Sequence, residues 1–457
     1  MRRRGGVPAA RRSARYHGRV LDLPLRRRFR PARACSRPCR HTAKDRHRYP
    51  HSTLRRGVSA RDQRGVPPLT GFRTAESRWA RLGPYYAMFP VEFARQVVAA
   101  FSEPGDRVLD PFCGRGTAPY VAMVSGRGAA GCDVNPVAWL YAAVKTDPHP
   151  SLIEVLGRIE EVARAVQRKD CRPRDEFQTL AFGRRALGFI NAARRELQWR
   201  TSGLDRTVSA LLVHYLHAKL GQGLSNQLRP TRAMCPDYSV RWWRKRGLTT
   251  PPDVDPAAFL GARAAWRYAK GVPRYAGCAS VALGDAAHML PHMPASAGLV
   301  LTSPPYIGVT NYRADNWLRL WALAEGPARP NWSIDQKFCS AQRYESMLDT
   351  VLRVAHSRSR EDAVWCLRVD ARERTLNVVR RVMTRLLPDY RTYERPSPSP
   401  RRTQTRLYGD DRKKPGDVDL VYLHRSRREP TFLRSFRLVR VLARRELDSG
   451  YAHAAGT

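Results

Sequence analysis

The chain has 457 residues, of which 42% are hydrophobic, so it is long enough to bury the cores of two or three domains. Its formal net charge of +42 favours a phosphate backbone as the partner. No apolar run approaches the roughly 20 residues that span a bilayer, and no apolar stretch follows the basic N-terminus. The nine scattered cysteines are typical of reduced thiols. We therefore expect a cytoplasmic protein that binds no membrane.

Residues 1–75 form a separate compositional region. They carry 22 Lys and Arg against three Asp and Glu, with no sustained hydrophobic period, which predicts a disordered basic tail. This tail is either a DNA-binding arm or upstream sequence added by a wrong start codon. Cys35, Cys39, His47 and His51 resemble a zinc finger only loosely, because seven residues separate Cys39 from His47 where about 12 are usual. We predict no metal site.

Residues 76–150 have the pattern of an opening α/β domain. A short strand leads into a glycine-rich loop, and a helix and a second strand follow, which is the βαβ unit of doubly wound folds. The expected elements are a helix over 90–101, a strand over 107–110, a helix near 118–125 and a strand over 128–133.

Residues 151–278 change character and predict a mainly helical insert, with helices over 152–167 and 204–220. The α/β pattern returns over 279–440. Its expected elements are strands over 280–285, 298–302, 363–369 and 418–423 and a helix over 376–387. The predicted fold class is α/β, a doubly wound Rossmann-like sheet interrupted by a helical insert and preceded by the disordered tail.

Three predicted strands end in an acid, namely Asp110, Asp133 and Asp285. A helix N-cap or a turn acid explains any one of them equally well. Because the carboxyl ends of parallel strands share one edge of a sheet, three such acids also suit a ligand with a cationic group, a ribose diol and an amine. Gly114 and Gly116 lack a Cβ atom, so the backbone of the loop can approach this ligand closely.

A second loop, Thr302-Ser-Pro-Pro-Tyr306, suits a planar base with an exocyclic amine. The Ser303 hydroxyl and the Pro304 carbonyl can accept hydrogen bonds from that amine, and Tyr306 can stack on the base. Pro304 and Pro305 stiffen the loop. The base must first leave the duplex, at a cost of a few kcal/mol. The alternative is a proline-rich turn before a helix over 316–323.

Residues 107–135 and 281–306 resemble the class I S-adenosylmethionine-dependent methyltransferases, and specifically the DNA amino-methyltransferases that make N6-methyladenine or N4-methylcytosine. The resemblance implies S-adenosylmethionine as the cofactor, with its methionine end in the first loop, its ribose at Asp133 and its adenine at Asp285. It also implies that Phe89 belongs to an element that closes over the cofactor. The implied cofactor-binding residues are Phe89, Asp110, Pro111, Phe112, Cys113, Gly114, Gly116, Thr117, Asp133 and Asp285, and the implied catalytic residues are Ser303, Pro304, Pro305 and Tyr306.

Serine at position 303 favours cytosine N4, since the family more often has Asp or Asn there for adenine. The function expected is site-specific methylation of double-stranded DNA, with a restriction endonuclease as a candidate partner. Adenine N6, guanine N2 in RNA, and an inactive nucleic-acid-binding homologue remain alternatives. We expect the insert to read DNA, although a solvated basic helix with core tryptophans explains its pattern equally well. The candidate DNA-binding residues are Arg229, Arg232, Arg241, Trp242 and Arg244.

Overall fold

The structure is a computed structural model, and it describes most of the chain beyond the predicted tail. Residues 1–68, the loose zinc motif among them, lie outside the described residues, as does the segment with Phe89. The described residues are 69–85, 90–217, 219–226, 228, 231, 234–308, 311–326, 340–397 and 416–439.

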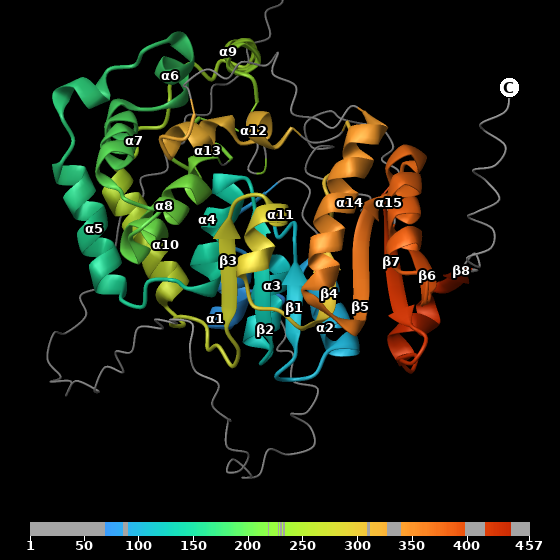
Figure 1. Ribbon diagram of the computed structural model, residues 1–457. Coiled ribbons are helices and arrows are strands. Elements are labelled where there is room, and N and C mark those ends of the chain that lie inside the picture. Colours follow the sequence, from blue (N-terminus) through green and yellow to red (C-terminus); the bar gives the residue numbers. More distant parts are fainter. Residues whose placement is uncertain are drawn as a thin grey trace, which may run out of the picture. The chain divides into compact units, whose positions relative to one another are not determined.

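One mixed sheet runs through the described residues. Its strands are β1 (Arg107–Asp110), β2 (Gly128–Asp133), β3 (Ala279–Leu283), β4 (Ala297–Thr302), β5 (Ser359–Asp370), β6 (Tyr390–Ser397), β7 (Asp417–His424) and β8 (Arg437–Val439). They are ordered β3-β2-β1-β4-β5-β7-β6-β8 (Figure 1). Strands β1 to β5 are parallel, whereas β6, β7 and β8 pair antiparallel. The chain order reverses beside β1, which is the switch point of a doubly wound sheet.

Helices cover both faces of this sheet (Figure 1). The helices near the strands are α1 (Ala75–Ala80), α2 (Val91–Phe101), α3 (Thr117–Val124), α4 (Pro136–Thr146), α11 (Ala286–Met289), α14 (Ala341–Ser357) and α15 (Glu373–Leu386). Two short helices, α12 (Tyr312–Asp315) and α13 (Trp317–Ala322), follow β4 and lie beyond the strand ends (Figure 1). The side chains of β4 alternate between the two faces. Leu299 and Leu301 pack in the same core as α2 and α3, whereas Val300 packs in the core with α14 and α15. The α/β fold predicted from the sequence is confirmed.

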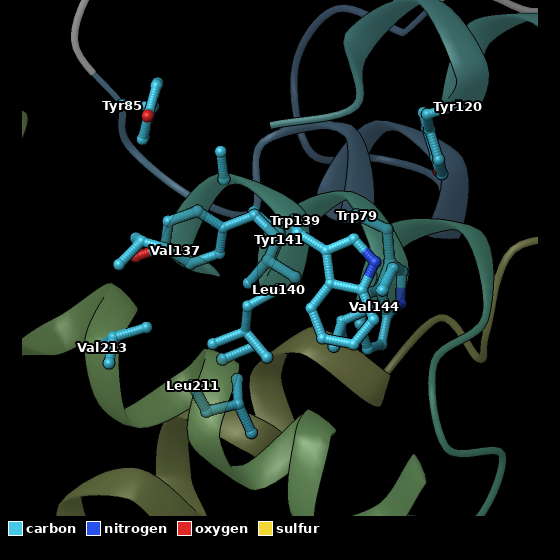
Figure 2. Packing of buried hydrophobic residues seen from close by; sticks show 14 of the residues in the cluster. Trp79, Tyr85, Tyr120, Val137, Trp139, Leu140, Tyr141, Val144, Leu211 and Val213 are labelled. Atoms are coloured by element: carbon cyan, nitrogen blue, oxygen red, sulfur yellow. The ribbon is translucent and has the colours of Figure 1, made fainter. Parts of the chain in front are cut away.

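The predicted helical insert is a run of helices between β2 and β3. They are α5 (Leu152–Arg164), α6 (Glu176–Ala181), α7 (Arg184–Glu196), α8 (Gly203–Leu216), α9 (Pro236–Lys245) and α10 (Pro256–Tyr268). This segment shares a hydrophobic core with α4. Figure 2 shows Leu140 of α4 close to Leu211 of α8 within that core. The helical segment and the sheet therefore share one hydrophobic core.

Candidate functional site

A cavity of about 290 Å³ opens at the carboxyl ends of the first four strands. It brings together three segments that are far apart in the sequence, namely the glycine-rich loop after β1, the end of β3 and the loop after β4. The residues predicted from the sequence that line it are Pro111, Phe112, Cys113, Gly114, Thr117, Asp133, Asp285, Ser303 and Pro305. The two loops singled out by sequence therefore meet at one cavity.

The glycine-rich loop is held by the end of the neighbouring strand. The backbone N–H of Gly114 donates to Asp133 Oδ2 at 2.9 Å, and that of Asn135 donates to Asp133 Oδ1 at 2.8 Å. The Cys113 N–H donates to the Cys132 carbonyl at 3.0 Å. Burial raises the pKa of Asp133 to about 6, although these backbone donors favour its charged form. Asp133 thus shapes the loop and also presents a carboxylate to the cavity.

The two glycines of this loop have different roles. Gly114 lines the cavity, and a Cβ atom added there would meet nothing within 4 Å. Gly116 is the N-cap of α3 with φ +73°, and a Cβ atom there would lie 2.6 Å from the Cβ of Ala142 in α4. Gly116 does not line the cavity. It is needed for close packing of two helices, whereas Gly114 leaves room for a ligand.

Asp110 is buried and does not line the cavity. Its side chain is 1% exposed, and its Oδ1 accepts from the Thr302 hydroxyl at 2.7 Å and from the Phe112 N–H at 3.2 Å. Its Oδ2 is buried without a hydrogen-bond partner in the described part of the chain. Burial raises its pKa to about 7. Asp110 therefore links the first loop to the last residue of β4.

Asp285 is both a helix N-cap and a residue of the cavity wall, the two roles considered for the acids at the strand ends. It is the N-cap of α11, where its Oδ1 accepts from the Ala287 N–H at 2.9 Å, and its exposed side chain lines the cavity. Met347 and Val351 of α14 line the same cavity and were not predicted. No motif announces them, because α14 reads only as an amphipathic helix. A carboxylate near apolar side chains suits an aromatic ring that carries an amine.

The loop after β4 is held by strands β5 and β7. Ser303 Oγ donates to the Arg368 carbonyl at 2.9 Å, and Tyr306 Oη donates to Asp417 Oδ1 at 3.0 Å. A hydroxyl has one proton and two acceptor lone pairs, so Ser303 keeps its lone pairs for another donor. Pro304 is buried, and neither Pro304 nor Tyr306 lines the cavity. The four residues predicted as catalytic are adjacent, but only Ser303 and Pro305 reach the cavity.

Comparison with known proteins supports the interpretation of the first loop. Residues 37–143 match the family model described as DNA methylase. This part of the chain is similar to the DNA methylases. The resemblance to DNA amino-methyltransferases inferred from the sequence is confirmed, although the second loop, 303–306, lies outside the matched residues.

The curated relatives are methylases that match over short segments. The chain is 38% identical over 71 residues to the type II methyltransferase M.Cfr9I of Citrobacter freundii, covering 14% of this chain and 24% of that protein. It is 43% identical over 53 residues to the type II methyltransferase M.SmaI of Serratia marcescens, covering 12% of this chain and 18% of that protein. The chain thus spans about a quarter or less of the curated relatives it matches.

Solved structures give weaker likenesses. An rRNA methyltransferase, aviRa from Streptomyces viridochromogenes, matches with a TM-score of 0.26 and 14% identity over 78% of this chain and 96% of its own. A precorrin 8W decarboxylase of Methanobacterium thermoautotrophicum matches with a TM-score of 0.29 and 10% identity over 74% of this chain and 92% of its own. The doubly wound α/β fold is defined by the order of its own strands.

The candidate DNA-binding residues are only partly described. Arg229 and Arg232 lie outside the described residues, and Arg241 is exposed on α9. Trp242 is half-buried with the Arg246 guanidinium 4.1 Å from its ring, and Arg244 forms an ion pair with Glu176. These contacts occupy Trp242 and Arg244 within the protein, so Arg241 is the described candidate with the freest side chain.

The sequence predicts no metal site and no binding to a membrane. Among them, no group of three or more metal-ligating side chains is placed to hold an ion. No helix in the same part of the chain is long and apolar enough to cross a membrane.

Proposed function

We propose that this protein transfers a methyl group from S-adenosylmethionine to the exocyclic amine of a base flipped out of double-stranded DNA. The observation that carries the proposal is the shared cavity, which joins Gly114 of the first loop and Asp133 at the end of β2 to Ser303 of the second loop. A ligand held by the first loop would therefore lie beside the residue that we expect to hold the amine. The match of residues 37–143 to the DNA methylases supports the same function.

The residues at the cavity fit S-adenosylmethionine. Asp133 and Asp285 offer carboxylate oxygens for the ribose and the adenine amine, and Gly114 leaves space for close approach. The buried Oδ2 of Asp110 has no partner in the described structure, and a cationic neighbour would offset that cost. When bound, this cofactor supplies an electrophilic methyl group on a sulfonium.

Ser303 would hold the amine. An exocyclic amine is a poor nucleophile, because its lone pair is delocalised into the ring. Hydrogen-bond acceptors that favour a pyramidal nitrogen make this lone pair available for attack on the methyl group. Ser303 Oγ already donates its proton to the Arg368 carbonyl, so toward the cavity it offers lone pairs. Tyr306 would stack on the base, and Pro305 would keep the loop in position.

Cytosine N4 is the favoured target, and the support for it is Ser303 itself. A neutral hydroxyl stands where family members specific for adenine more often have Asp or Asn.

We also propose that α9 contacts DNA through Arg241. Figure 1 places α9 at the same end of the molecule as the carboxyl ends of the parallel strands. A basic exposed side chain there suits a phosphate. A partner restriction endonuclease remains a prediction.

Digestion and mass spectrometry of nucleosides test this function. Purified protein is incubated with labelled S-adenosylmethionine and either DNA or tRNA and rRNA, with Ser303→Ala as the control. We expect N4-methyldeoxycytidine in DNA and none with the control. N6-methyldeoxyadenosine would overturn the Ser303 argument and keep the enzyme class. Label only in RNA would support guanine N2 as the target, and no label at all would support an inactive homologue.

A further inference from the structure

Tyr306 is tied to an acid that no sequence motif contains. Its hydroxyl donates to Asp417 Oδ1 at 3.0 Å, and Asp417 is the first residue of β7. The two residues are 111 positions apart in the chain. Asp417 therefore contacts the predicted catalytic loop from an adjacent part of the sheet.

Asp417 belongs to a row of three acids on the β5–β7 pair, and it differs from the other two. Asp370 pairs with Arg372 at 3.0 Å, and Asp419 pairs with Arg368 at 2.7 Å. Among the described residues, no basic side chain forms an ion pair with Asp417. Its described hydrogen bond through the side chain goes to Tyr306.

Burying this carboxylate is costly, and its surroundings do little to lower the cost. Burial raises the pKa of Asp417, and the negative charges of Asp370 and Asp419 raise it further. The hydrogen bond from Tyr306 and the charge of Arg368 act in the opposite direction. An acid that adds no ion pair to the described sheet contributes little to folding. Its position is better explained by the tyrosine that it contacts.

We propose that Asp417 is a positioning residue, which holds the ring of Tyr306 at a fixed angle beside Ser303 so that a flipped base stacks in register with its acceptor. This inference rests on the proposed function, since it assumes that Tyr306 meets a base. Ser303 is held from the neighbouring strand, because its hydroxyl donates to the Arg368 carbonyl. In the register of the sheet, Arg368 pairs with Asp419 and Asp370 pairs with Asp417.

One strand pair thus sets both the acceptor and the stacking ring. A ring without this hydrogen bond would sample more orientations, and binding of the base would have to restrict the ring to one of them. A hydroxyl held by a carboxylate removes that freedom beforehand, and such preorganisation lowers the barrier to reaction. The consequence is that Tyr306→Phe and Asp417→Ala should remove the same interaction.

A double-mutant cycle on methyl transfer tests the role. We expect Tyr306→Phe and Asp417→Ala each to slow single-turnover transfer about tenfold, and the double variant to be no slower than the slower single variant. The affinity for S-adenosylmethionine should stay within about twofold of wild type. Asp417→Asn keeps an oxygen acceptor and should restore most of the rate. Asp389→Ala removes an exposed acid before β6 and serves as the control for lost charge.

Fluorine NMR of protein labelled with 3-fluorotyrosine tests the contact without relying on activity. The resonance of Tyr306 is the one lost in Tyr306→Phe. It should shift in Asp417→Ala and stay unmoved in Asp389→Ala. Wild-type transfer in Asp417→Ala, additive effects in the double variant, or an unmoved resonance would each overturn the inference. If wild type methylated no DNA amine, the proposed function and the base-positioning role would both fail, and the resonance would still decide the contact.

Discussion

The two loops that meet at the cavity are built differently. The first loop is held mainly by its neighbours in sequence, since Gly114 bonds to Asp133 only 19 positions away. The second loop is held by distant strands, since Ser303 bonds to a residue 65 positions away and Tyr306 to one 111 positions away. Local support lets the first loop form together with its βαβ unit. The second loop depends on completion of the sheet.

This difference makes the two loops vulnerable to different changes. Substitutions in the first loop should affect folding or cofactor binding, whereas substitutions in the second should affect transfer. Three predictions test the first half of this contrast, at the first loop and the acids beside it, and a fourth tests the DNA contact proposed for α9.

The largest expected effect comes from Gly116→Ala. The new Cβ atom would lie 2.6 Å from that of Ala142, at a φ of +73°. Strain and overpacking together should lower the free energy of unfolding by about 2–4 kcal/mol, measured by urea denaturation. Gly114→Ala is the matched control, because its Cβ atom would meet nothing within 4 Å. It should cost about 1 kcal/mol and mainly weaken cofactor binding. Equal losses of stability in both variants would contradict this division.

Asp133→Asn should weaken cofactor binding and lose one of the two hydrogen bonds that hold the loop. The amide keeps one oxygen acceptor for a loop N–H but removes the negative charge beside the cavity. We expect S-adenosylmethionine affinity to fall by roughly 10–100-fold, because hydrogen bonds to charged groups are worth about 1.5–3 kcal/mol. Isothermal titration calorimetry measures the change. Unaltered affinity would remove Asp133 from the cofactor site.

Cofactor affinity should rise with pH between about 5.5 and 7.5. Burial raises the pKa of Asp133 to about 6 and that of Asp110 to about 7, so both carboxyls are partly protonated in that window. A cationic ligand favours the charged forms, so binding releases protons and strengthens as these groups ionise. The folded free protein binds more protons than the unfolded chain over the same window, so its stability should fall as pH rises. Calorimetry in buffers of different ionisation enthalpy measures the proton release. Proton uptake on binding would contradict the assignment.

Arg241→Ala should give the smallest effect. Arg241 is exposed on α9, and loss of one phosphate contact should weaken DNA binding only a few-fold and equally for all sequences. The slope of affinity against salt should fall by about one. Fluorescence anisotropy at several salt concentrations measures both quantities. Arg244→Ala is the comparison, because Arg244 is paired with Glu176. A larger loss for Arg244 than for Arg241 would reverse the assignment.

The same contrast explains what the sequence could predict. The sequence predicts the first loop and its two flanking strands, β1 and β2, because the residues that determine them lie within one short stretch of chain. It predicts the second loop, 302–306, because the residue types of that loop are unusual. Asp417 and Met347 carry no local signal, since an acid at the start of a strand and a methionine in an amphipathic helix are both common in proteins. Their roles depend on the folded structure, in which Asp417 of β7 contacts Tyr306 and Met347 of α14 lines the cavity.

The most direct test of this account is a crossed measurement on two variants, Ser303→Ala and Asp133→Asn, in which cofactor affinity and single-turnover methyl transfer to DNA are measured together. Ser303→Ala should bind S-adenosylmethionine like wild type and transfer nothing. Asp133→Asn should bind it weakly and recover much of its transfer rate at saturating cofactor. Loss of cofactor binding in Ser303→Ala, or full turnover without its hydroxyl, would contradict the division of labour between the two loops.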